Sequence, residues 1–296
     1  MGPYEEEVMA DQIELRLNKI KTSYMNYFKI DDHDLQVITT DDMYTCQKNY
    51  GFTENDIRVL DEAKARANWA HVAACMKYPK TMDEPFTLIF KRPYLKRVDE
   101  AELYRLMFHE LTHYVDYKDY ARIHNLSSYR ELFRNRETAL FQHWSEYHAE
   151  RRGYGAYLKH RHGVRLKFDP TPRKIKIMEE ETLKNMMYYA EHYINTAEYG
   201  ESRQIYFTMH LLSRISIWLQ ILPYQVEDIL TNQIFKYRGM EWIKKLLHLF
   251  LKYPTLDQMD PHFPEMVRII AESLTMGKDE VFEHAACLDS LDEIIF

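Results

Sequence analysis

Glycine and proline, the residues that most often mark turns, are scarce in this sequence. It holds eight glycines and ten prolines among 296 residues. A sandwich or barrel of many strands needs many tight turns, and these depend largely on the two scarce residues. We therefore expect long helices rather than an all-β fold. The length is sufficient for one large domain or two smaller ones, with at least one buried core.

Cysteine is rare as well. Cys46, Cys75 and Cys287 lie far apart in the sequence, and no C-x-x-C pair is present. Neither a disulfide framework nor a cysteine-based zinc ribbon is therefore expected. Dispersed cysteines are typical of proteins in a reducing compartment. The first residues also lack the positive charge and apolar core of a signal peptide, so we expect a cytoplasmic protein.

Long apolar runs and an excess of positive charge are both missing. Charged residues interrupt the apolar stretches well short of the roughly 20 residues that a membrane-spanning helix needs. The net charge of −7 argues against general binding of nucleic acid, which relies on clustered Lys and Arg. One basic segment, from Lys159 to Lys176, is interpreted as a solvated connector, with a docking surface for an acidic partner as the alternative.

The composition that is present is that of a globular protein, with 46% hydrophobic and 29% charged residues. Apolar spacing predicts a helix over 5–28, and a second helix is expected to begin near Thr53 and Asp56. Aromatic and β-branched residues predict short strands at 35–39, 69–76 and 86–90. The first part of the chain, residues 1–165, is therefore expected to be an α+β domain.

The second part, residues 166–296, is expected to be an all-α domain. The boundary is placed near Gly163 to Pro172, because the run Asp169-Pro-Thr-Pro172 cannot continue a helix. The apolar segment from Ile205 to Leu222 is interpreted as a buried core helix rather than a cofactor site. Helices are expected over about 173–198, 201–221, 225–235, 239–252, 262–275 and 279–294.

One motif carries a specific chemistry: His109-Glu110-Leu111-Thr112-His113. It lies in a predicted helix for which Asp99 is a suitable N-cap. Histidines four residues apart share one helix face, so both imidazoles can bind a single ion. Glu110 lies beside that face, where a carboxylate can act as general base on zinc-activated water. The motif therefore predicts a zinc site, with His109 and His113 as ligands and Glu110 as the catalytic base.

A catalytic zinc ion needs a third protein ligand and one open position. In the predicted helix from Arg136 to His160, the side chains of His143, Glu146 and Glu150 share one face, whereas His148 points elsewhere. Glu146 is central and is the expected third ligand, with His143 and Glu150 as alternatives. Glu150 is one turn further on and could accept the spare N–H of a ligand histidine.

The motif from His109 to His113, followed by Glu146-Tyr-His-Ala-Glu150, resembles the gluzincin metallopeptidases. In that group a glutamate on a second helix completes the zinc site, and an acidic residue four positions on supports it. The run from Ser145 to Leu158 is also similar to the ImmA/IrrE-like metallopeptidases, although Glu150 stands where that family usually has Asn or Asp. The resemblance covers the chain from Phe86 to Leu158.

The resemblance implies a zincin-like catalytic domain, a zinc cofactor and hydrolysis of peptide bonds in a protein or peptide substrate. It also implies that Phe86–Lys91 is an edge strand that binds the substrate backbone. A regulatory or binding protein that keeps the zinc site is the alternative. A SprT-like protease acting on DNA-bound proteins is a further rival, against which the net acidity and the missing cysteine ribbon argue. The oligomeric state is not indicated.

Overall fold

The chain folds into an α+β structure, mostly helical, with one small mixed sheet, as the sequence predicts. The fold is described from a computed structural model. It covers residues 3–31, 33–50, 72–79, 81–129, 131–132, 138–163, 201–221, 241–274 and 279–282, and the single positions 180, 184, 188 and 277. The predicted helix after Thr53, the helices over 173–198 and 225–235 and most of that over 279–294 lie outside these residues.

The sheet has the strand order β1-β3-β2, formed by Leu35–Thr40, Phe86–Lys91 and Ala74–Lys77. β3 is parallel to β1 and antiparallel to β2. The prediction that Phe86–Lys91 is an edge strand is therefore wrong, because this strand has a partner on each side. Its run of five buried residues, all apolar except Thr87, is typical of a central strand. Among the described strands, β1 and β2 form the edges.

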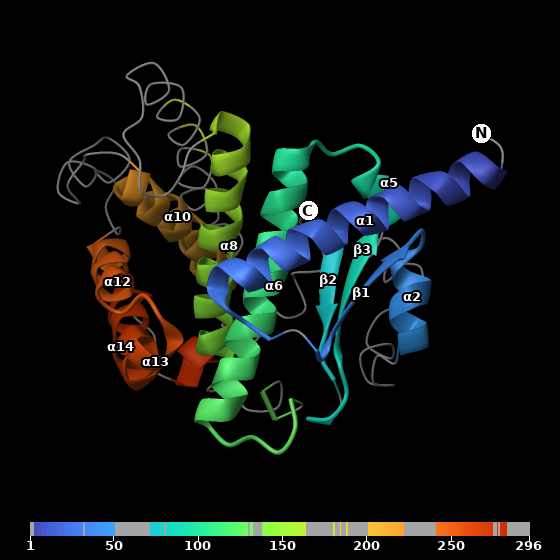
Figure 1. Cartoon of the computed structure of the whole chain (residues 1–296). Helices are drawn as coiled ribbons and strands as arrows, with labels where there is room; N and C mark the ends of the chain where they lie inside the picture. Colours follow the sequence, from blue (N-terminus) through green and yellow to red (C-terminus); the bar gives the residue numbers. More distant parts are fainter. Residues whose placement is uncertain are drawn as a thin grey trace.

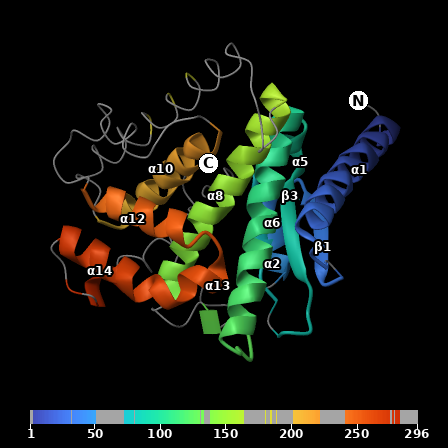
Figure 2. The same cartoon turned by 60° about the vertical axis from the view of Figure 1, so that its left-hand side comes forward.

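Two long antiparallel helices, α6 (Glu100–Ile123) and α8 (Ala139–His162), pack against each other, and α6 lies between α8 and the sheet (Figures 1 and 2). Asp99 caps α6 as predicted, its side chain accepting a hydrogen bond of 2.9 Å from the backbone N–H of Glu102. α8 ends at Gly163, whose φ of 66° is the left-handed conformation that glycine adopts readily. α8 is buried on nearly all sides because it lies between α6 and a third helix, α10 (Glu201–Ile221).

The helix α1 (Pro3–Phe28) crosses this pair (Figure 1) and contacts both of its members. The Tyr24 hydroxyl forms a hydrogen bond of 3.0 Å with Thr112 of α6 and accepts one of 2.8 Å from Arg152 of α8. Residues 5–28 are helical as predicted. The buried face of this helix, which includes Tyr24, packs on α6 and helps to fix the helix that carries the histidine motif.

The remaining described elements are helices. They are α2 (Met43–Tyr50), α5 (Arg92–Leu95), α12 (Glu241–Lys252), α13 (Leu256–Met259), η4 (Asp260–His262) and α14 (Phe263–Leu274). The helices predicted over 201–221, 239–252 and 262–275 are confirmed, whereas the short helices α2, α5 and α13 were not predicted. None of the described helices is both long and apolar enough to cross a membrane.

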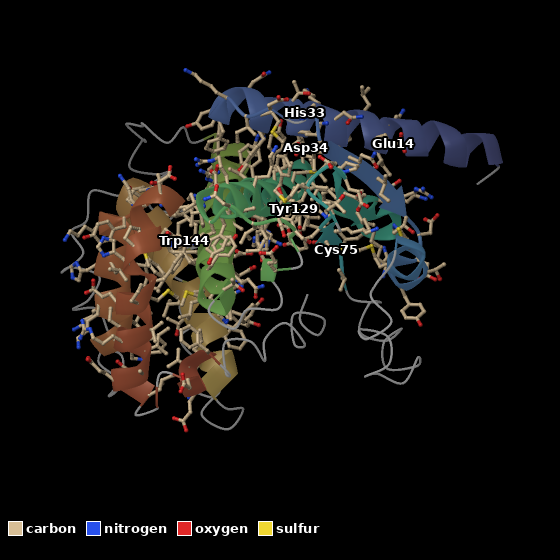
Figure 3. All side chains as sticks on the ribbon, turned by 90° about the horizontal axis from the view of Figure 1, so that it is seen from below. Glu14, His33, Asp34, Cys75, Tyr129 and Trp144 are labelled. Carbon is tan, nitrogen blue, oxygen red and sulfur yellow. The ribbon has the colours of Figure 1, made fainter. Side chains whose placement is uncertain are left out.

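One hydrophobic core extends through all of these layers, from Ile13 in α1 to Val281 near the end of the described chain. Trp144 lies on the side of α8 that faces the C-terminal helices (Figure 3), with its ring 6.4 Å from that of Phe263. The division of the chain at residue 165 stays a prediction. What the structure does show is that α10 packs against α8, so the second part of the chain adjoins the predicted zinc site.

Candidate metal centre

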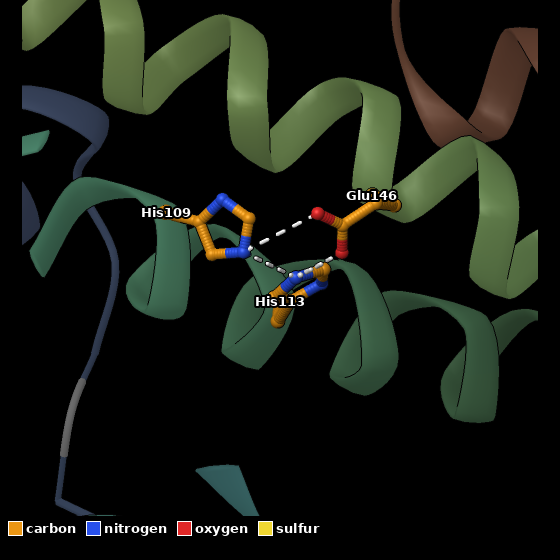
Figure 4. Close-up of side chains that lie close together, drawn as sticks. All are labelled: His109, His113 and Glu146. Carbon is orange, nitrogen blue, oxygen red and sulfur yellow. Dashed lines mark hydrogen bonds and ion pairs between the residues drawn. The ribbon is translucent and has the colours of Figure 1, made fainter. Parts of the chain in front are cut away.

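Three side chains from two helices converge at one point: His109 and His113 on α6, and Glu146 on α8 (Figure 4). The Nε2 atoms of the two histidines lie 3.1 Å apart. Oε2 of Glu146 lies 3.2 Å from Nε2 of His113, and Oε1 lies 3.6 Å from Nε2 of His109. The structure therefore brings together the three residues that were predicted as metal ligands.

These distances fit one zinc ion. With Zn–N bonds of 2.0–2.1 Å, a tetrahedral ion holds its ligand atoms about 3.3 Å apart. Two imidazole nitrogens and one carboxylate oxygen are the donor set of many catalytic zinc sites. The side chains of His109, His113 and Glu146 keep 12%, 12% and 16% exposure, so solvent can reach this side of the group.

Each histidine also has a polar neighbour at its outer nitrogen. Nδ1 of His109 lies 3.2 Å from Oε1 of Glu150, and Nδ1 of His113 lies 2.9 Å from the Ser145 hydroxyl. An acceptor at Nδ1 favours the tautomer with its proton there, which leaves the lone pair of Nε2 directed at the point where the three side chains converge. Glu150 therefore has the supporting position that the sequence predicts for it.

Behind His113 lies a second, fully buried hydrogen-bond network. Ser145 donates to Oδ2 of Asp116 at 3.0 Å, and Nδ1 of His148 lies 2.9 Å from Oδ1 of the same carboxylate. Burial lowers the pKa of His148 to about 4, although Asp116 opposes the shift, so a neutral His148 donates to Asp116. His148 therefore points away from the three converging side chains, as expected, and helps to hold one of them indirectly.

Glu150 is held between two arginines and is 1% exposed. Arg105 of α6 donates to Oε1 at 3.2 Å, and Nη2 of Arg214 lies 2.7 Å from Oε2. Burial alone would raise the pKa of Glu150, but Arg214, His109 and Arg105 hold it well below its usual range. Both carboxylate oxygens are thus engaged, which argues against Glu150 as the third ligand. His143, the other alternative, is buried and lies outside the converging group.

The group of three side chains attracts positive charge. Burial lowers the pKa of His109, but the charges of Glu146 and Glu150 outweigh this effect and raise it to about 9. Burial likewise raises the pKa of Glu146, and the charges of His109 and His113 bring it down to about 2. The buried carboxylates of Glu146 and Glu150 thus favour positive charge at this point.

Glu110 is buried beside the two histidines, with an exposure of 7%. Burial raises the pKa of its carboxyl group, although the charges of His109 and His113 oppose the shift. A carboxylate with a raised pKa accepts a proton more readily, which is what a general base requires. The position and environment of Glu110 are therefore compatible with its predicted role.

Several residues around the group were not predicted, among them Arg105 of α6 and two residues of α10. Nε2 of His210 lies 3.7 Å from Oε1 of Glu146, and Arg214 pairs with Glu150. The segment from Ile205 to Leu222 does contribute a core helix, but its interpretation as core alone was incomplete. The signal in the sequence is a histidine and an arginine four residues apart in an apolar helix, since such residues share a face.

A glycine permits the close approach of α6 and α8 at this site. A Cβ atom at Gly153 would lie 2.7 Å from the carbonyl oxygen of Arg105 and 3.2 Å from Cβ of His109. A side chain of any size would therefore push the helices apart, next to a predicted ligand. Gly153 lies on the same helix as Glu146, so the spacing it permits helps to set the distance between that carboxylate and the histidines.

No protein family, curated protein or solved structure matches this chain. The resemblance to gluzincins and to ImmA/IrrE-like metallopeptidases thus remains an interpretation of the sequence motifs. The functional argument depends on the residues themselves and on the geometry in which His109, His113 and Glu146 meet.

Proposed function

We propose that this protein is a zinc-dependent metallopeptidase with a zincin-like catalytic domain, acting on a protein or peptide. The observation that carries the proposal is the convergence of His109, His113 and Glu146 within 4.8 Å, with Glu110 buried beside them. Bound by these residues, zinc would supply Lewis acidity, which polarises a carbonyl group and makes water a stronger acid near neutral pH.

The chain itself would perform the remaining tasks. Glu110 accepts a proton from the attacking water and later donates it to the leaving amine, because its carboxyl group is next to the histidines and has a raised pKa. Glu150 and Ser145 hold the outer nitrogens of His109 and His113, so that the imidazole rings need no reorientation. The exposed side of the group would receive the peptide.

The test is the variant Glu110→Gln, which nearly preserves size and hydrogen bonding but removes the base. We expect it to fold and to retain about one zinc ion per chain, as the parent does. Proteolysis should fall by about 10²–10⁴-fold, the usual contribution of a general base. Zinc content is measured by elemental analysis, with His113→Ala as the matched control that should lose the ion.

Substrates for this test are sought among the proteins that co-purify with the inactive Glu110→Gln variant, which is expected to retain them. Each is then incubated with the parent and with the variant. The hydrolase proposal fails if the parent cleaves none of them and Glu110→Gln keeps full biological effect in cells. The protein would then be a binding protein with a zinc site.

A further inference from the structure

A second group of possible metal ligands adjoins the first. Glu146, Glu150 and His210 each place one ligand atom within 4.8 Å of the others. Glu146 belongs to both groups, with Oε2 near His113 and Oε1 near His210. A carboxylate shared in this way is typical of hydrolases with two metal ions about 3.5–4 Å apart. The ligand types alone would therefore permit a two-metal centre.

The second position, however, already has a cation from the protein. Nη2 of Arg214 lies 2.7 Å from Oε2 of Glu150, the oxygen that would face a second ion. Nη1 of Arg214 donates to the backbone carbonyl of Glu150 at 3.4 Å, and its guanidinium lies 4.0 Å from the ring centre of Tyr154. The Arg214 side chain is 5% exposed, so this cation is built into the interior.

The charges of the site favour one metal ion over two. Glu150 pairs with both Arg105 and Arg214, and Arg105 also pairs with Glu102 at 2.8 Å. With neutral histidines, the carboxylates of Glu102, Glu110, Glu146 and Glu150 exceed these two guanidinium charges by two, and a single divalent ion cancels that excess. A second divalent ion would leave two uncompensated positive charges at a largely buried site, which is strongly unfavourable.

We propose that Arg214 occupies the place of a second metal ion and thereby keeps the centre mononuclear. Arg214 is also a positioning residue, because it holds Glu150 in contact with the outer nitrogen of His109. This inference rests on the proposed zinc site, but it does not depend on peptide hydrolysis. It assigns a function in the zinc site to α10, a helix outside the two that carry the predicted ligands.

The experiment counts zinc ions per chain in the full-length protein at increasing zinc concentration. The parent should bind one ion even when zinc is in excess. Arg214→Met removes the guanidinium and should bind two ions, the second held by Glu146, Glu150 and His210. Arg214→Lys keeps a cation and should bind one. Affinity for the first ion should fall about 10–100-fold in Arg214→Met and recover in part in Arg214→Lys.

A double variant tests the assignment of the second ion. Arg214→Met combined with His210→Asn should return to one ion per chain, because a ligand of the new position is missing. Removing one partner of a buried ion pair is destabilising, so Arg214→Gln, which keeps an amide donor, is measured in the same way if Arg214→Met does not fold.

Three results would contradict these proposals, and they can be told apart. If the parent binds two ions, the inference about Arg214 is wrong, but the zinc site stands. The same holds if Arg214→Met and Arg214→Gln both fold and each binds only one ion. A parent that binds no zinc overturns the zinc site itself, and with it the proposed function.

Discussion

The two faces of α6 differ in how they are held. Met107, Leu111 and Tyr114 form a stripe toward the sheet, where the Tyr114 ring packs against Phe86 with 5.1 Å between ring centres. His109 and His113 point the other way, toward α8 and α10, and meet carboxylates from α8. One helix thus contributes to an apolar core on one side and to a buried polar cluster on the other.

This comparison distinguishes the apolar packing that stabilises the fold from the buried polar cluster that forms the candidate metal centre. Apolar burial on the sheet face is favourable in itself, at roughly 25 cal/mol per Å² of apolar surface. Burying charges on the opposite face costs desolvation free energy, and the ion pairs there at best offset that cost. A concentration of paired charges such as Glu150 with Arg105 and Arg214 is therefore better explained by a site than by stability.

The largest expected effect of breaking the polar face is loss of the ion. Glu146→Ala removes one of three ligands, so zinc should be lost on dialysis, while the apolar face of α6 is untouched. His148→Ala is the matched control on the same helix, since His148 acts only through Asp116 and Ser145. Its effect on zinc affinity should not exceed about 10–100-fold, the range for outer partners of metal ligands.

The two variants are compared by the amount of zinc that each chain retains after dialysis. If His148→Ala loses the ion as completely as Glu146→Ala, or if Glu146→Ala keeps it, Glu146 is not the third ligand.

A change at Gly153 should affect both stability and zinc binding, because this glycine sets the spacing of α6 and α8. In Gly153→Ala the new methyl group meets the backbone carbonyl of Arg105, which cannot move aside without shifting the helix. We expect a loss of about 1–3 kcal/mol in the free energy of unfolding, as for other overpacked sites. Zinc affinity should fall as well, because Glu146 and Glu150 move with α8.

Gly155→Ala is the control, two residues along the same helix. Its methyl group would meet the flexible end of Ile217 at 3.3 Å rather than backbone. The unfolding free energy of this variant should stay close to that of the parent. Equal stability and equal zinc affinity in the two variants would show that Gly153 does not control the helix spacing.

The parts of the site that could be predicted from sequence are those governed by local spacing. Histidines four residues apart define a helix face wherever the helix lies, and Asp99 gives a cap signal that needs no tertiary contact. The face shared by Glu146 and Glu150 was predictable for the same reason. Which of them joins the two histidines depended on Arg105 and Arg214, whose positions become known only when the helices pack.

The contribution of α10 and the place of β3 show why the rest could not be predicted. His210 is 64 residues from Glu146 in the chain, and no local pattern indicates that the two side chains meet. The apolar residues of β3 predicted a strand correctly, but strand order is set by pairing between distant segments. The sign of a central strand that the sequence offered was the mostly apolar run from Phe86 to Phe90.

The smallest expected effect concerns an ion pair on the sheet face of α6. Lys118 lies 2.9 Å from the carboxylate of Asp34, which also accepts a hydrogen bond from the Tyr114 hydroxyl. Burial would raise the pKa of Asp34, but Tyr114 and Lys118 together lower it below its usual value. Because the pKa is lower in the folded protein, ionised Asp34 stabilises the fold above its unfolded pKa, and this stabilisation is lost as the pH falls through the folded pKa.

Asp34→Asn removes the charge but keeps an acceptor for Tyr114. At pH 7 the variant should be less stable than the parent by about 0.2–1 kcal/mol, the range for partly exposed ion pairs. The difference should begin to shrink as the pH falls below the unfolded pKa of about 3.9, and it should vanish only below the lower pKa of the folded protein. Urea unfolding of both proteins at pH 7, 5 and 3 measures it, and a gap as large at pH 3 as at pH 7 would contradict the assignment. Zinc content should be unchanged in Asp34→Asn, because this pair lies on the face of α6 that does not contribute to the zinc site.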